Sequence, residues 1–413
     1  MKIRFTFIYL LFFIFLNSCS LNRTIEKELL KCPYSNYEFA SDSTNYPIIE
    51  LNDSKKALKS HTCYFLIENV HIVDTKRGKI DSNRFVLLHH GIIQKVSKSK
   101  INITIGQDMD DWLNTRLIDR IDAYSRYYLS PGLAKMHSHY CGEEKNKELR
   151  NGVTTIRNIL YRNENDLGRS YQRIKLLEDE MYLIQQNKLI GPTILTTSLE
   201  TDKLDLASIN AVSGNSLKWI FFSNKFSAVD DKEFKSFKKM KIPLSIDKLY
   251  TNFDNSLPKG SVLENFRLFP YFEKDKRFDT YWKIINLDSS VLENPSDEVN
   301  AIFSHFNYAK DKMCLGAHFT DNFNFYEQFD LLDRWFTRPE IVKMATYNAG
   351  EMCKEIYKDD IPFGYIKEGY KADLILLEKN PLDRHNEMHY NTYSNPFLIF
   401  VNGNSLHSID LFK

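Results

Sequence analysis

Two histidines separated by one residue, His137 and His139, are the strongest chemical signal in the sequence. They end the stretch SPGLAKMHSH at 130–139, whose apolar residues favour a β-strand. Side chains at i and i+2 of a strand point to one face, so the two imidazoles are expected to project together and to be able to share a metal ion. Imidazole suits zinc, nickel and similar divalent ions. Cys141 would share that face as a soft ligand if the strand continues, whereas an exposed pair without any role is the alternative.

The elements that would position this pair fall into three zones. Short β-rich runs between 63 and 128 favour a small sheet or sandwich. From 129 to about 356, strand-like runs alternate with helix-like patterns, which predicts a parallel α/β sheet or barrel. The strand-like runs are 134–139, 154–159, 193–197, 219–222, 243–246, 261–265 and 313–315, and the helical patterns include 171–186, 231–239 and 339–356. Strand-like runs return at 372–377 and 398–401, near the end of the chain.

Composition narrows the classes of protein that fit. The chain has 413 residues, of which 43% are hydrophobic, and a formal net charge of +1, which indicates a globular protein of one large domain or two ordinary ones. Because 55 basic residues balance 54 acidic ones, nothing suggests a nucleic-acid partner. Six cysteines are too few for a disulfide scaffold. The sequence has no glycine-rich phosphate loop and no Gly-x-Ser-x-Gly turn, which argues against a nucleotide-dependent enzyme and a serine hydrolase.

The amino terminus is predicted to be an export signal. Lys2 and Arg4 precede an apolar run at 5–16, which is too short to span a bilayer but suits a signal peptide. The run ends in LNSC, which resembles a bacterial lipobox, so residues 1–19 are expected to be a lipoprotein signal and Cys19 the lipidated residue. An ordinary secretory signal or an uncleaved anchor is the alternative.

The resemblance to a lipobox implies a location as well. We expect the protein to be lipid-anchored in a bacterial cell envelope, on the periplasmic side or at the outer membrane, with residues 20–60 as a tether. The lipid would make the membrane a partner of the chain. Cys32 and Cys63 are candidates for a disulfide between tether and domain, which the sequence leaves open.

Several segments resemble, in the right order, the amidohydrolase superfamily, in particular its imidazolonepropionase and prolidase-like branch. The pattern around the His pair and the segment NGVTTIR at 151–157 look like the first two barrel strands of that family. The segment GYIKEGYKADLILL at 364–377 is the most specific match and is similar to the strand by which that family's chain re-enters its small sheet. Weaker similarities are LID at 117–119, IDA at 121–123, PEIVKMATYNAG at 339–350, NPL at 380–382 and VNG at 401–403.

This resemblance, over roughly residues 63–405, implies an α/β fold with two parts. Residues 129–356 would form a (β/α)8 TIM-like barrel, and residues 61–128 and 357–413 a composite β-sandwich. It also implies a small-molecule substrate whose C–N bond, in a cyclic or amino-acyl amide, is hydrolysed by water activated on one or two divalent ions, with zinc as the expected metal.

The sequence departs from that family at most of the remaining metal positions. The family adds a carboxylated Lys on strand 4, a His on each of strands 5 and 6, and an Asp on strand 8. The corresponding residues here are Phe221, Asp247, Asn265 and His318.

Two interpretations remain open. In the first, a single metal is held by His137, His139 and Asp247, together with His318, which with a suitable pKa would also serve as the catalytic base. In the second, the barrel is kept while the catalytic site has decayed, and its cavity or surface serves only for binding.

Overall fold

The computed structural model describes most of the chain after the predicted tether. The described residues are 64–102, 118–140, 145–160, 167–185, 189–201, 220–222, 244–246, 262–264, 282–285, 294–305, 310–317, 325, 328–357, 362–383 and 390–407. The predicted signal peptide with Cys19, the tether, Cys32 and Cys63 lie outside these residues, and so does the helix predicted at 231–239. The division into domains and the disulfide therefore stay predictions.

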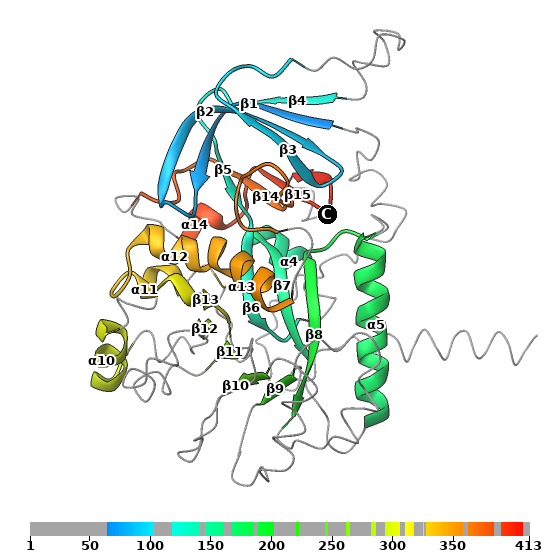
Figure 1. Ribbon diagram of the computed structural model, residues 1–413, viewed down its shortest axis with the longest axis vertical. Coiled ribbons are helices and arrows are strands. Elements are labelled where there is room, and N and C mark those ends of the chain that lie inside the picture. The colour runs from blue at the N-terminus through cyan, green and yellow to red at the C-terminus, as the bar shows by residue number, and fades with distance from the viewer. Residues whose placement is uncertain are drawn as a thin grey trace, which may run out of the picture.

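One sheet combines strands from both ends of the described chain (Figure 1). Its order is β16-β15-β14-β5-β1-β2-β3, and a further strand, β4, pairs in parallel with β1. The strands are β1 (Tyr64–Asp74), β2 (Lys79–His89), β3 (Ile92–Ser97), β4 (Ile118–Asp122), β5 (Tyr128–Pro131), β14 (Leu374–Leu377), β15 (Leu398–Val401) and β16 (Asn404–His407). Since β5 pairs with β1 on one side and β14 on the other, early and late segments jointly hold the strand that leads to the His pair.

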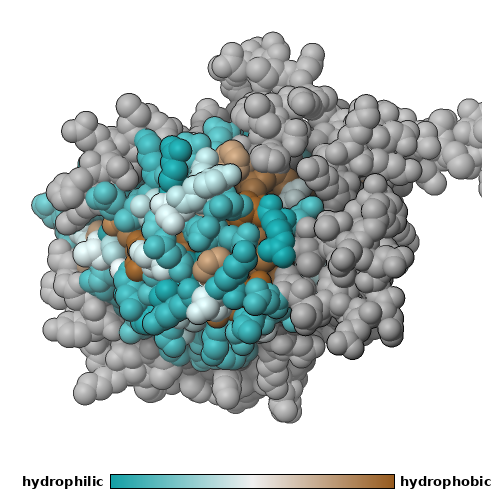
Figure 2. All heavy atoms as spheres, turned by 90° about the horizontal axis from the view of Figure 1, so that it is seen from above, coloured by the Kyte–Doolittle hydropathy of each residue, from teal (hydrophilic) through white to brown (hydrophobic). Residues whose placement is uncertain are grey.

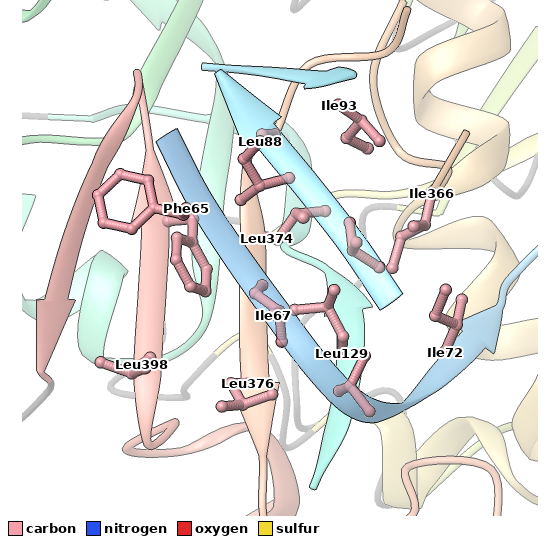
Figure 3. Close-up of a cluster of buried hydrophobic side chains, with 14 of the residues drawn as sticks. Phe65, Ile67, Ile72, Leu88, Ile93, Leu129, Ile366, Leu374, Leu376 and Leu398 are labelled. Atoms are coloured by element: carbon pink, nitrogen blue, oxygen red, sulfur yellow. The ribbon is translucent and has the colours of Figure 1, made fainter. Parts of the chain in front are cut away.

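Apolar side chains from both groups of strands form one core (Figure 3). Phe65 and Ile67 of β1 pack with Leu129 of β5 and with residues of β14 and β15, and Phe65 meets Phe400 edge to face at 5.8 Å between ring centroids. Fully burying one such side chain contributes about 1.5–3 kcal/mol, so this core joins the two segments strongly. The labelled core residues are Phe65, Ile67, Ile72, Leu88, Ile93, Leu129, Ile366, Leu374, Leu376 and Leu398.

The second sheet consists of eight parallel strands in the order of the sequence. They are β6 (Leu133–Ser138), β7 (Val153–Leu160), β8 (Thr193–Thr201), β9 (Ile220–Phe222), β10 (Leu244–Ile246), β11 (Val262–Leu263), β12 (Trp282–Ile285) and β13 (Met313–Leu315). Every neighbouring pair is parallel. The predicted α/β class is therefore confirmed.

The first and last strands of this sheet approach each other at their carboxyl ends. The backbone N–H of Ala317, just after β13, donates to the carbonyl of His137 in β6 at 3.0 Å. Gly316 permits this approach, because a Cβ there would lie 2.5 Å from the Cβ of His137. A flat sheet would separate β6 and β13 by about 34 Å, or seven strand spacings, so the sheet must curve strongly.

Helices lie between and beside the strands, and α5, the longest of those in the described residues, runs next to β8 (Figure 1). The helix predicted at 339–356 is two helices, α12 and α13, separated at Ala345 and Thr346. The Thr346 hydroxyl donates to the carbonyl of Val342 at 2.6 Å, a local bond that competes with a continuous helix. The helices are α4 (Lys145–Arg150), α5 (Leu167–Gln185), α10 (Asp297–His305), α11 (Gln328–Leu332), α12 (Arg338–Met344), α13 (Tyr347–Tyr357) and α14 (Tyr390–Tyr393), with a 3-10 turn, η5, at Lys310–Lys312.

The described residues that show on one face of the molecule are mainly polar (Figure 2). In the view from above, hydrophilic residues predominate and hydrophobic ones show in small areas between them (Figure 2). None of the helices in the described ranges is both long enough and apolar enough to cross a membrane.

Candidate functional site

The structure brings the two predicted histidines together at the carboxyl end of β6. His137 lies in the strand, and His139 follows directly after its last residue, Ser138. Both side chains are buried, and their ring centroids are 5.3 Å apart with nearly perpendicular planes. The i, i+2 spacing thus gives two adjacent imidazoles at the strand end where barrel enzymes build their sites.

The backbone after His139 is held by the neighbouring strand. The side-chain oxygen of Asn158, in β7, accepts the N–H of Tyr140 at 2.7 Å, and the Tyr140 hydroxyl donates to Glu180 of α5 at 3.0 Å. Burial raises the pKa of Glu180, and the charge of Lys145 and the Tyr140 hydroxyl oppose that rise only in part. This anchoring keeps His139 beside His137.

A buried carboxylate connects three strands at this edge. Glu264 directly follows β11, and its Oε2 is hydrogen-bonded to Nδ1 of His137. Its Oε1 accepts a hydrogen bond from Nη1 of Arg157 in β7 at 2.7 Å. His137 and Glu264 are each about 1% exposed, and Arg157 is fully buried. Nη1 of Arg157 also donates to the carbonyl of Met136 at 2.9 Å, so the guanidinium contacts β6 as well.

This network explains how two ionic groups persist in the interior. A buried charge is costly unless it is paired and hydrogen-bonded. Each oxygen of Glu264 meets a separate donor from a separate strand, which offsets the cost of burial and fixes the orientation of the carboxylate. Because Arg157 has donors only, it holds Glu264 as an acceptor.

The other predicted site residues lie outside the described part of the chain. These are Asp247, His318, Asn265 and Cys141. The backbone of Phe221 lies in β9, where this residue pairs with Ser245 of β10. Among the described residues, no group of three or more His, Cys, Asp or Glu side chains gathers as a metal site would.

Sequence reasoning missed Glu264 and Arg157. Their signal is present but weak: each is a charged residue in or directly after an otherwise uncharged strand. The carboxyl ends of parallel strands in a curved sheet converge, so a charge at such an end is a candidate partner for the His pair. A third buried charge on these strands, Lys283 of β12, was missed in the same way.

One observation of this structure indicates that the His pair suits a divalent ion. An imidazole that binds a metal through one nitrogen almost always donates its other N–H to a carboxylate, a carbonyl or water. His137 is bonded to Glu264 in this manner through Nδ1, so Nε2 would be the atom that holds an ion. His139 would be the second ligand, and Asp247 and His318 are the predicted others.

A surface cavity lies at the opposite end of the sheet. It has a volume of about 640 Å³ and is lined by residues that include Trp282, Lys312, Tyr347 and Glu355. Trp282 begins β12 and Lys312 precedes β13, so the cavity opens at the amino ends of the strands. It is therefore distinct from the site around His137.

Fold and site together define an α/β protein with a parallel sheet that carries buried imidazoles at its carboxyl edge. Three solved structures are similar in fold to the chain over nearly their whole length. A proposed prolidase from Bifidobacterium longum has a TM-score of 0.58 and 16% identity, covering 84% of this chain and 95% of its own. A structure described as an amidohydrolase has a TM-score of 0.58 and 12% identity, covering 83% and 99%. Molinate hydrolase has a TM-score of 0.57 and 12% identity, covering 84% and 96%.

These three structures establish the likeness in fold. Comparison of the sequence with protein-family models and with curated proteins finds no match.

Proposed function

We propose that the eight parallel strands close into a (β/α)8 barrel. The contact of Ala317 with His137 supports closure between β13 and β6. The bridge from Glu264 to His137 and Arg157 supports it too, since β11 and β6 would lie about 24 Å apart across five spacings of a flat sheet.

We further propose that the protein is a metal-dependent hydrolase of a C–N bond in a small-molecule amide. The observation that carries this proposal is the pair of adjacent imidazoles at the carboxyl edge, one of them oriented by a carboxylate. The pair lies at the carboxyl end of β6, the first strand of the parallel sheet. The likeness in fold to an amidohydrolase and to molinate hydrolase supports the same reaction class.

The roles of the chain's own residues follow from this geometry. His137 and His139 would hold a divalent ion, with zinc as the expected metal, and Asp247 would add a carboxylate ligand. When bound, such an ion supplies a nucleophilic water at neutral pH and polarises the scissile carbonyl. His318 would accept a proton from that water, and Glu264 would hold the ring of His137 in place.

Metal content is the first test. The protein beginning at Ser20, purified without chelator, is expected to contain about one zinc or similar ion per chain, and His137→Ala/His139→Ala is expected to lose it. Amides and cyclic ureides would then be screened for hydrolysis. If the unmodified protein binds no metal even with excess zinc, the hydrolase proposal fails.

A second candidate function is ligand binding without catalysis. Arg157 favours it, because a guanidinium 2.7 Å from Glu264 already balances that carboxylate and repels a further cation. Phe221 in β9, at the position of the family's bridging lysine, favours it as well. Lack of metal in the test above, with an intact fold, would support this candidate.

We also propose that Cys19 carries a lipid that anchors the protein in the bacterial envelope. The basic start, the short apolar run and the following cysteine support this proposal. Cells fed labelled palmitate are expected to label the protein and not its Cys19→Ala variant. Equal labelling of the two, or none, would contradict a lipid at this position.

A further inference from the structure

We propose that Glu264 is a positioning residue that sets the tautomer of His137, with its proton on Nδ1 and its lone pair on Nε2, and that Arg157 fixes Glu264 for this task. The relevance of this role for metal binding rests on the proposed function, but the tautomer itself does not. The contact between Glu264 Oε2 and His137 Nδ1 carries the inference.

The first step is the identity of the donor. A carboxylate has no proton to give, so the nitrogen that faces it must carry one. Nδ1 of His137 faces Glu264, and hence a neutral His137 has its acceptor lone pair on Nε2. A tautomer is set by the hydrogen bond that the other nitrogen makes.

The second step is the part played by Arg157. Its Nη1 donates to Oε1 of Glu264, while Oε2 serves His137. Because all three side chains are buried, water does not compete strongly for these positions. Arg157 also donates to the carbonyl of Met136, which directly precedes His137. The guanidinium that holds the carboxylate is therefore itself fixed to the backbone of β6 beside His137.

The third step is a substitution that reverses the tautomer with little change in shape. In Glu264→Gln, the donor-only guanidinium takes the amide oxygen, and the amide NH2 is left to face His137. Nδ1 must then accept, so the proton moves to Nε2, where it blocks ligation. Where an Asp holds a catalytic His in serine proteases, the same exchange to an amide gives the wrong tautomer and lowers kcat about 10⁴-fold.

The experiment uses the full-length protein in detergent, with ¹⁵N-labelled histidine. The signals of His137 among the eleven histidines are identified by their loss in His137→Gln. In metal-free protein, we expect a protonated Nδ1 in the unmodified chain and a protonated Nε2 in Glu264→Gln. A protonated Nε2 in the unmodified chain, or the same tautomer in both, would overturn the inference.

Glu148→Gln is the matched control. Glu148 is also a buried carboxylate beside β6, where it accepts a hydrogen bond from Lys135 at 2.9 Å, two residues before His137. It is expected to leave the tautomer of His137 unchanged. If it shifts the His137 signals as Glu264→Gln does, the effect is general and the inference is wrong.

Zinc titration separates this inference from the proposed function. Glu264→Gln is expected to weaken zinc binding about 10–100-fold, and Glu148→Gln to leave it unchanged. If no variant binds zinc but the tautomer reverses as expected, the metal proposal fails and the positioning role stands. Should Glu264→Gln not fold, the unmodified chain still tests the inference, because a proton on Nε2 of His137 in that chain would overturn it.

Discussion

Glu264 connects strands of the parallel sheet at the described part of its carboxyl edge. Three strands, β6, β7 and β11, contribute to its contacts. Replacing a whole buried ion pair by apolar groups is often nearly neutral, but removing one partner leaves an uncompensated charge. Replacing Arg157 alone should therefore cost more free energy of unfolding than replacing Arg157 and Glu264 together.

This asymmetry gives a prediction for stability. Arg157→Met is expected to lower the free energy of unfolding by about 3–5 kcal/mol, because it leaves the buried Glu264 carboxylate without its charged partner. Arg157→Met combined with Glu264→Gln is expected to lose less than Arg157→Met alone. Urea unfolding of both variants checks this, and a double variant that loses as much free energy of unfolding as Arg157→Met, or more, would contradict the prediction.

Single residues also show where prediction from the sequence succeeds and stops. His137 and His139 could be paired from their spacing, because strand geometry alone fixes it. The hydrogen-bond partner of His137 could not be predicted in this way. Glu264 is 127 positions away, and the strand that precedes it, β11, consists of Val262 and Leu263. Such a contact depends on the curvature of the whole sheet, which no local pattern records.

At the scale of elements, the start of α12 shows how one carboxylate stabilises a helix end. Glu340 Oε2 accepts the N–H of Thr337 at 2.7 Å, and its Oε1 accepts a hydrogen bond from Lys310 at 2.7 Å. Burial acts to raise the pKa of Glu340, but the hydrogen bonds from Lys310 and Thr337 together outweigh it, so the pKa is lowered. The ionised form is thus favoured in the folded state.

This lowered pKa makes the contribution of Glu340 depend on pH. The stabilisation is present above the ordinary pKa of a glutamate and is lost as the pH falls through the lowered, folded-state value. Glu340→Gln is expected to cost about 1 kcal/mol at pH 7 and almost nothing in strong acid. Urea unfolding at a series of pH values checks this, and a constant difference between variant and parent would refute it.

The elements that sequence patterns predicted best are those with strong local signals. The strand at 313–315 agrees at both ends with β13, and that at 398–401 with β15. The predicted helix at 339–356 was wrong in its continuity, because Thr346 forms its bond to Val342 where the helix should continue. The strand β12 was missed, since Trp282, Lys283 and two isoleucines have no alternating pattern.

At the scale of the whole molecule, Asp373 connects the two sheets. It directly precedes β14 and accepts hydrogen bonds from the Thr193 hydroxyl of β8 at 2.8 Å and from the backbone of Asn402 at 3.1 Å. Burial raises the pKa of Asp373, and the charge of Lys371 with these two hydrogen bonds opposes the rise only in part. The pKa of Asp373 is thus shifted in the opposite direction from that of Glu340.

The raised pKa predicts a loss of stability with rising pH. An ionised Asp373 is less favourable in the folded than in the unfolded chain, so its contribution falls as the pH rises from the ordinary aspartate pKa to the raised value. Relative to Asp373→Asn, which does not titrate, the parent should lose free energy of unfolding across this window and then level off. Parallel pH profiles in urea unfolding would contradict the shift.

The general architecture was accessible from the sequence through resemblance, while the way its parts meet was not. Alternation of strands and helices predicted the α/β class, and the structure and its neighbours agree. Contacts such as Thr193 with Asp373 join segments far apart in the chain, and neither side chain is distinctive in its own surroundings.

The composite sheet also fixes the order in which the protein can be completed during synthesis. Tyr128 of β5 pairs with Leu377 of β14, so more than half of the chain must be made before this strand gains its second neighbour. Until then, β5 presents an open row of backbone donors and acceptors, which invites pairing with other chains. A chain stopped before residue 374 would therefore carry an unprotected strand edge beside its candidate site.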